Sequence, residues 1–196
     1  MKTVFIVLLM ALSADKMFST ENPEHMLTFN GKDLDGWKMT GTGRFIVDDG
    51  MLRTEGGQVL LFYAFPQYAG AGHFHVEFKV AGNGDAGILI RMKEPSASSA
   101  GVRTGYKIRI ASDGDKWHCT GAIEGLSPAR ACLQKPNGEW NTADIWIGAY
   151  VTVLVNGTEV NSIPQGDENG RFYGLENHDA GSLVYFRSAM FRPNFN

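Results

Sequence analysis

The sequence of 196 residues has no excess of basic residues. Its 18 Lys and Arg residues stand against 21 Asp and Glu residues, which leaves a formal net charge of -3 at pH 7. A protein that binds nucleic acid needs a basic surface to neutralise phosphate groups. The charge balance therefore argues against nucleic acid as a partner and favours a neutral polar ligand.

Familiar catalytic signatures are also missing. The sequence contains no GxSxG elbow, no phosphate-binding P-loop, no HExxH zinc motif and no GxGxxG segment between a strand and a helix. The paired carboxylates of an ordinary glycosidase cannot be chosen either, because they are defined by their separation in space. Any site must be argued from the placement of single residues.

Long hydrophobic runs are limited to the first residues. Lys2 precedes an almost wholly apolar stretch at residues 3–12, and small residues follow it. The stretch is too short to cross a bilayer, which takes about 20 apolar residues, but it is typical of a signal peptide. We expect a signal at residues 1–14, a linker at 15–25 and one domain at 26–196, exported to the periplasm, the cell surface or the medium. The alternative is a buried first strand or helix.

Only two cysteines are present, Cys119 and Cys132. Their spacing lacks the CxxC pattern of a zinc knuckle. Outside the reducing cytosol we expect a disulfide between them that pins the intervening loop. The alternative is two unpaired buried thiols.

Helical periodicity is absent over any useful length, whereas apolar and polar residues repeatedly alternate. The clearest cases are residues 74–80, 106–110 and 151–155, and such alternation is what a half-buried strand requires. Dipeptides such as Asn83-Gly84 and Asn156-Gly157 lie between the strands and tolerate the positive φ angles of tight hairpins. The sequence therefore predicts an all-β domain, built as a sandwich or a barrel.

The polar faces of the predicted strands carry charged side chains. Glu77, Arg91, Lys107 and Arg109 each stand on such a face. If the strands are neighbours, these residues form a floor that binds a hydroxyl-rich ligand through charge-assisted hydrogen bonds. The alternative is a solvated face whose opposite charges pair with one another.

One spacing is compatible with a metal site. In His73-x-His75-x-Glu77 the side chains point to one side of a strand and can reach a single cation. A divalent cation is therefore a candidate cofactor, with His73 and His75 as ligands. The alternative is a pair of hydrogen-bonded surface histidines, because local spacing supplies no third ligand.

Two further features suit a carbohydrate ligand. Trp140 lies in a loop, where its ring is either a platform for a sugar or a plug at the edge of the sandwich, whereas Trp146 is expected in the core. His178 lies among hydrogen-bonding residues that include Glu176, and an imidazole titrates near neutral pH. The alternative for His178 is a loop histidine bonded to the backbone.

Five phrases occur in a fixed order. They are LTFNGKDLDGW (27–37), DAGILIR (85–91), TGAI (120–123), GEWNT (138–142) and GLENH (174–178). Together they resemble the DUF1080 family, the 3-keto-disaccharide hydrolase domain. The resemblance implies a concanavalin A-like or LamG-like jelly roll of two packed antiparallel sheets. It also implies an exported enzyme that acts on glycosides whose C3 hydroxyl has been oxidised to a ketone.

The chemistry implied by this resemblance needs a base and an electrophile. A C3 ketone acidifies the C2 proton, and the enolate formed by its removal expels the C1 substituent, with later water addition in a hydrolase. The implied roles are His178 or Glu77 as the base and Arg91 or a divalent cation as the electrophile, with Glu124 as a further catalytic carboxylate. The expected sugar contacts are Tyr106, Lys107, Arg109, Trp140, Asn141 and Glu176.

The chain departs from the family pattern at several positions. Lys107 and Arg109 stand where the family commonly has Glu and Gln, Ser112 replaces Asp, and Glu124 replaces Tyr. Two functions therefore stay open. One is an enzyme, hydrolase or lyase, for 3-keto-glycosides, and the other is a noncatalytic carbohydrate-binding module on the same fold.

Overall fold

The computed structural model describes residues 27–64, 71–95, 104–167 and 170–193, so the predicted signal peptide and linker lie outside the described residues. The described segments form strands and contain no helix. They accordingly offer no helical segment of the length and hydrophobicity that membrane crossing demands. The prediction of an all-β domain is confirmed.

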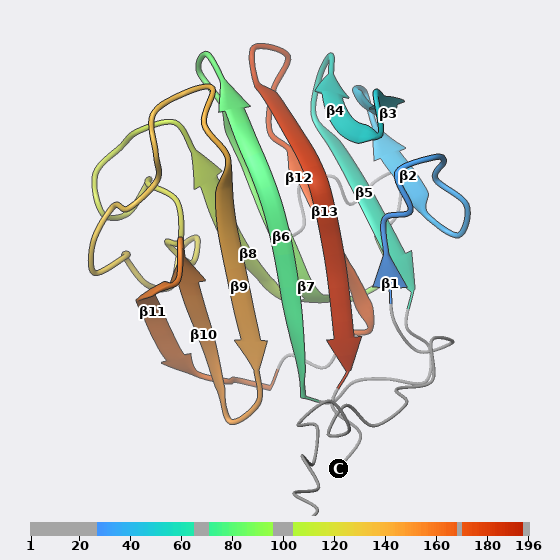
Figure 1. Ribbon diagram of the computed structural model, residues 1–196. Helices are drawn as coiled ribbons and strands as arrows, with labels where there is room; N and C mark the ends of the chain where they lie inside the picture. Colours follow the sequence, from blue (N-terminus) through green and yellow to red (C-terminus); the bar gives the residue numbers. More distant parts are fainter. Residues whose placement is uncertain (1–26, 65–70, 96–103, 168–169, 194–196) are drawn as a thin grey trace, which may run out of the picture.

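Thirteen strands of the described chain form two antiparallel sheets. The larger sheet contains, in spatial order, β11 (Thr158–Pro164), β10 (Tyr150–Val155), β9 (Asn141–Ile147), β6 (Gly72–Ala81), β13 (Leu183–Pro193), β4 (Met51–Glu55) and β3 (Arg44–Asp48), with β1 (Leu27–Thr28) paired to β13. The smaller sheet contains β2 (Lys38–Gly41), β5 (Val59–Ala64), β12 (Phe172–Asn177), β7 (Asp85–Met92) and β8 (Tyr106–Ala111). Figure 1 shows the larger sheet in front of the smaller one, as in a sandwich.

The core lies between the two sheets. Along β6 buried and half-buried residues alternate over all ten positions, and Phe74, Val76 and Phe78 are fully buried. β12 contributes Tyr173 and Leu175 from the facing sheet to the same core. The alternation read from the sequence therefore identifies the inner face correctly, because a strand turns successive side chains to opposite sides.

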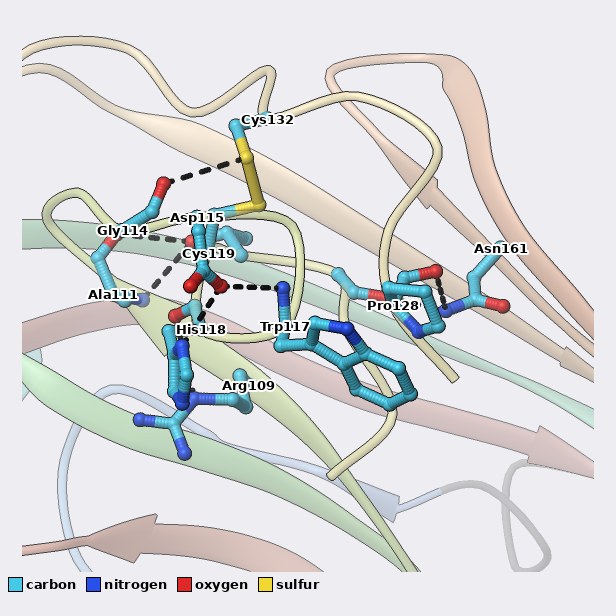
Figure 2. The surroundings of a disulfide bond; sticks show 12 residues. Arg109, Ala111, Gly114, Asp115, Trp117, His118, Cys119, Pro128, Cys132 and Asn161 are labelled. Carbon is cyan, nitrogen blue, oxygen red and sulfur yellow. Dashed lines mark hydrogen bonds and ion pairs between the residues drawn. A yellow bond between two sulfur atoms is a disulfide. The ribbon is translucent and has the colours of Figure 1, made fainter. Parts of the chain in front are cut away.

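A long segment between β8 and β9 is held by a disulfide. Cys119 and Cys132 are bonded, with their Cα atoms 5.7 Å apart. In the turn just before Cys119, the Asp115 carboxylate accepts hydrogen bonds from the backbone N–H of Trp117 and from the His118 ring, each at 2.8 Å (Figure 2). Disulfides persist outside the reducing cytosol, so this bond is consistent with an extracytoplasmic protein.

Candidate functional site

A group of charged side chains lies on the outward face of the five-stranded sheet. Lys107 and Arg109 are two residues apart on β8, so they point to the same side. Glu176 on β12 shares that side, because Gly87 of β7 is aligned with both Arg109 and Glu176. Glu124 follows β8 in a segment whose backbone is hydrogen-bonded to β8. The charged cluster, as we define it, comprises Asp85, Lys107, Arg109, Glu124 and Glu176.

Lys107 is the buried centre of the charged cluster, with only 2% of its side chain exposed. Its Nζ atom lies 2.7 Å from Oε2 of Glu176 and 3.1 Å from Oε2 of Glu124. The amide of Gln58 donates a hydrogen bond to the other carboxylate oxygen of Glu176 at 3.2 Å. Because a buried charge is tolerated only when it is paired, each of these groups depends on the others.

Arg109 connects the buried part of the charged cluster, around Lys107, to its more exposed rim at Asp85. Its Nη2 lies 2.7 Å from Oδ2 of Asp85, and its Nη1 lies 3.4 Å from Oε1 of Glu124. Its Nε donates to the backbone carbonyl of His118 at 3.3 Å, and Figure 2 shows these two residues side by side beneath the disulfide loop. Arg109 is therefore oriented by three acceptors while its side chain stays 13% exposed.

A hollow of about 480 Å³ opens at this rim. Asp85 and Arg109 line it together with residues between the end of β8 and Cys119 and with the turn that follows β12. The residues of the lining are Asn83, Gly84, Asp85, Arg109, Ala111, Ser112, Asp113, Gly114, His118, Asp179, Gly181 and Ser182. A hollow of this size, lined by charged and backbone groups, suits a small polar ligand.

His178 lies at the same end of the sheet. It directly follows β12, and its backbone N–H donates to the carbonyl of Asp85 at 3.0 Å. The side chain is half-buried, and its Nδ1 atom is enclosed with no hydrogen-bond partner among the residues that the structure describes. The neighbouring Asp179 belongs to the lining of the hollow. His178 therefore lies next to the lining of the hollow, although it is not itself one of the lining residues.

Arg91 lies at the opposite end of β7 from Asp85. It has a φ angle of 55° at a point where the pairing between β7 and β12 shifts register. Its guanidinium is buried and donates to the side-chain oxygen of Gln165 at 3.2 Å. Asp85 and Arg91 are six positions apart, which corresponds to about 20 Å along a strand. The structure therefore does not bring Arg91 and His178 to one site.

Glu77 and Trp140 lie on the other side of the sandwich. Glu77 belongs to β6 of the larger sheet, and both of its carboxylate oxygens accept hydrogen bonds from Arg187, at 2.9 and 3.2 Å. The Arg187 guanidinium also lies 4.4 Å from the centre of the Trp140 ring. Arg187 therefore covers one face of this ring. The floor expected to join Glu77 with Lys107 and Arg109 is therefore divided between two sheets.

Tyr106 and Asn141 hold the backbone in place. The Tyr106 ring belongs to the inner core, and its hydroxyl accepts a hydrogen bond from the backbone N–H of Gly166 at 2.8 Å. The buried Asn141 side chain accepts from the backbone N–H of Lys135 at 2.8 Å and from the Asn156 amide at 3.0 Å. Neither residue belongs to the lining of the hollow.

The two candidate metal ligands converge on one carboxylate. Oδ1 of Asp144 lies 2.9 Å from Nε2 of His73 and 2.8 Å from Nδ1 of His75. These hydrogen bonds hold the pKa of Asp144 far below its usual range, and the bond to Asp144 raises the pKa of His75.

Trp146 stacks on His73 and is 47% exposed, so the expectation that it lies in the core is wrong. Its neighbours Ile145 and Ile147 take the inward positions instead.

A family model for the 3-keto-alpha-glucoside-1,2-lyase-like domain matches residues 24–192. The chain belongs to this family. The match covers the charged cluster, the hollow and His178 together. No protein among the curated sequences matches this lyase-like domain.

Solved structures share the fold of this lyase-like domain. A "putative glycosyl hydrolase" from Parabacteroides distasonis is 23% identical with a TM-score of 0.69, over 85% of this chain and 92% of that chain. The carbohydrate binding module CBM66 from Bacillus subtilis is 13% identical with a TM-score of 0.54, over 81% and 96%. The exoplasmic/lumenal domain of VIP36, solved with Ca²⁺ and Man3GlcNAc, is 14% identical with a TM-score of 0.62, over 88% and 90%. The jelly-roll sandwich is therefore confirmed.

The charged cluster of this lyase-like domain does not fit a divalent cation. The Lys107 ammonium already lies between the carboxylates of Glu124 and Glu176, within 3.1 Å of both. A metal ion in this space would be repelled by Lys107 and by Arg109 beside it. The carboxylates of the charged cluster therefore neutralise Lys107 and Arg109.

Sequence reasoning missed three residues that shape these sites. Asp85 and Gln58 contact Arg109 and Glu176, and Asp144 holds the two histidines. One of them carried a usable signal, because Asp144 alternates with the buried residues of β9, whereas the residues of β7 after Asp85 are all buried. Gln58 precedes β5 in a turn, and no pattern in the sequence pointed to it.

Proposed function

We propose that this protein is an exported enzyme that cleaves 3-keto-glycosides at the hollow beside Arg109. The observation that carries the proposal is that the partly exposed guanidinium of Arg109, the hollow and His178 all lie at one end of the smaller sheet, and that Nδ1 of His178 has no hydrogen-bond partner among the described residues. The family match supports the 3-keto-glycoside as substrate class. The disulfide supports an extracytoplasmic location.

The reaction is an elimination that the C3 ketone makes possible. A base removes the proton from C2, and the electron pair of the C2–H bond moves toward the carbonyl to form an enolate. The enolate then forms the C1–C2 double bond as the C1–O bond breaks, and the leaving oxygen takes up a proton. If water adds afterwards, the net reaction is hydrolysis. Such an enzyme needs one proton acceptor and one group that stabilises the enolate oxygen.

His178 is the proposed proton acceptor. Its Nδ1 makes no hydrogen bond to a described residue, and a rotation of the side chain that turns this enclosed nitrogen toward the hollow would let it take up the C2 proton. Imidazole is the side chain best suited to accept a proton near neutral pH. The bond from the backbone of His178 to Asp85 fixes this residue at the edge of the hollow.

Arg109 is the proposed electrophile, with Lys107 behind it. Asp85 and Glu124 hold the guanidinium in one orientation, and Arg109 lines the hollow. Preoriented donors are effective because they need no rearrangement when charge develops on the enolate oxygen. Lys107 adds positive charge beneath Glu124, and Glu176 anchors Lys107.

Aryl release from an aryl 3-keto-glucoside tests the proposal, with the unoxidised glucoside as the substrate control. We expect release only from the keto compound. His178→Gln should lower kcat by at least about 100-fold, as the loss of a general base does. Glu77→Gln is the matched control, because Glu77 lies on the opposite sheet and pairs with Arg187. Equal turnover by the His178→Gln variant and the wild type would rule out this base.

A noncatalytic carbohydrate-binding module is the second candidate. It is favoured by the similarity of the fold to CBM66 and to the VIP36 domain, and by the complete pairing of Lys107 inside the protein. In that case neither glucoside is cleaved, sugars still bind in calorimetry, and Asp85→Asn weakens their binding. Turnover of the keto compound by the wild type would exclude this second function.

A further inference from the structure

A second chemically distinct site lies on the outward face of the larger sheet, on the opposite side of the sandwich from the hollow. β6 and β9 are neighbours there, and their register aligns His75 with Asp144 and His73 with Trp146. We propose that His73, His75 and Asp144 bind a divalent transition-metal ion. This proposal is independent of the catalytic proposal, since none of the three residues lines the hollow.

The ligand atoms are already gathered. Nε2 of His73 and Nδ1 of His75 both lie within 2.9 Å of Oδ1 of Asp144, and the three atoms are all within 4.8 Å of one another. Metal bonds to imidazole nitrogen and carboxylate oxygen are about 2.0–2.2 Å long, so atoms sharing one ion are at most about 4 Å apart. Small rotations of the three side chains bring them to that spacing without backbone movement.

The surroundings leave room for an ion. The three side chains are 18–23% exposed, so an ion reaches them from solvent and keeps positions for water. The Trp146 ring stacks on the His73 ring with centroids 4.0 Å apart and planes 10° apart. This contact orients His73 toward the carboxylate, in the way that groups around a metal site orient its ligands.

The donor set selects the class of metal. Two imidazoles and one carboxylate suit Zn²⁺, Cu²⁺, Ni²⁺ or Fe²⁺. Ca²⁺ and Mg²⁺ require mainly oxygen ligands, and this group offers a single carboxylate. Among the divalent first-row ions, Cu²⁺ is expected to bind most tightly, as it does at most nitrogen and oxygen sites.

Calorimetric titration of Zn²⁺ into tag-free protein, previously stripped with a chelator, provides the first test. We expect one ion per chain. His75→Gln and Asp144→Asn should each weaken binding by more than the roughly 10–100-fold lost when only an outer partner of a ligand is removed. His118→Gln is the matched control, because His118 also pairs with an aspartate but is exposed and, among the described residues, belongs to no group of three possible metal ligands. Unchanged affinity in both site variants would overturn the proposal and leave the group as a hydrogen-bonded clasp.

Quenching of tryptophan fluorescence by Cu²⁺ gives a second measurement that does not depend on the folding of the ligand variants. Trp146 lies against His73, so an ion at this site should quench it strongly. Trp146→Phe keeps a stacking ring and all three ligands, and it should remove most of the saturable quenching. Quenching of the same size in Trp146→Phe and the wild type would place the ion elsewhere and contradict the proposal.

Discussion

At the residue scale, one oxygen atom of Asp144 organises two imidazoles. The hydrogen bond to this carboxylate is the main cause of the raised pKa of His75, partial burial opposes it, and the charges of Asp144 and Glu77 add to it. Arg192 acts in the opposite direction. The charged form of His75 is thus favoured in the folded protein.

This environment predicts a titration that can be measured in chelator-treated protein. By NMR we expect His75 to have a pKa above about 6.5, the ordinary value of histidine, and Asp144→Asn should lower it. The folded pKa of His75 is raised, so its stabilising contribution is complete below the unfolded pKa and is lost as the pH rises through the folded pKa. Asp144 has a lowered pKa, so its contribution is present above about pH 4 and disappears in acid.

The resulting contribution to the free energy of unfolding is greatest between about pH 4 and 6.5. Urea denaturation should therefore give a larger free energy of unfolding at pH 5.5 than at pH 9 as far as this pair contributes. This part of the difference should be absent in Asp144→Asn and present in His118→Gln. An Asp144→Asn variant with the same pH dependence as the wild type would show that the pair makes no such contribution.

At the element scale, a glycine of β7 makes room for a lysine side chain of the neighbouring strand β8. A Cβ atom at Gly87 would lie 2.7 Å from Cε and 2.9 Å from Cγ of Lys107. Lys107 cannot easily swing aside, because its ammonium is held by Glu124 and Glu176 and its side chain is only 2% exposed. The glycine in the phrase DAGILIR therefore leaves space for the Lys107 side chain.

Gly87→Ala should therefore destabilise the protein by about 1–3 kcal/mol, the usual cost of overpacking. Gly148→Ala is the matched control, since nothing lies within 4 Å of a Cβ atom there, and its effect should stay within about 0.5 kcal/mol. Urea denaturation at neutral pH measures both. Equal midpoints for Gly87→Ala and the wild type would mean that Lys107 has an alternative position.

The end of β7 shows a limit of reasoning from alternation. The pattern placed Arg91 on the same face as Leu89, but Phe172 and Gly174 of β12 pair with Met92 and Leu89, so β7 carries one extra residue. Met92 consequently joins Leu89 in a small apolar group. A bulge depends on pairing with another strand, and the sequence of β7 alone does not reveal it.

At the scale of the whole molecule, the disulfide acts on the unfolded chain. Cys119 and Cys132 are 13 residues apart, and closing a loop of this length stabilises a fold by about 3 kcal/mol in the loop-entropy model. The double variant Cys119→Ala/Cys132→Ala should lose about that much, since the bond no longer restricts the unfolded ensemble.

Urea unfolding followed by tryptophan fluorescence measures this loss. Adding a thiol reductant to the wild type should lower its midpoint toward that of the double variant, whose own midpoint should not respond. A wild-type midpoint that stays constant after the free thiols have been verified would contradict the prediction.

The sequence by itself determined the all-β class and the inner face of clearly alternating strands such as β6, and it predicted the pairing of its only two cysteines. These properties follow from local alternation, turn residues and composition, which act within one strand or one loop. The sequence also identified His178, Lys107, Arg109, Glu124 and Glu176 as candidates.

Only the tertiary structure decided which of the candidates meet. It placed Glu77, Trp140 and the two histidines on one side of the sandwich and the charged cluster on the other, and it separated Arg91 from His178. It also added Asp85 and Asp144 as partners. The physical reason is that each site is formed across strands distant in sequence, so its composition depends on strand order and register.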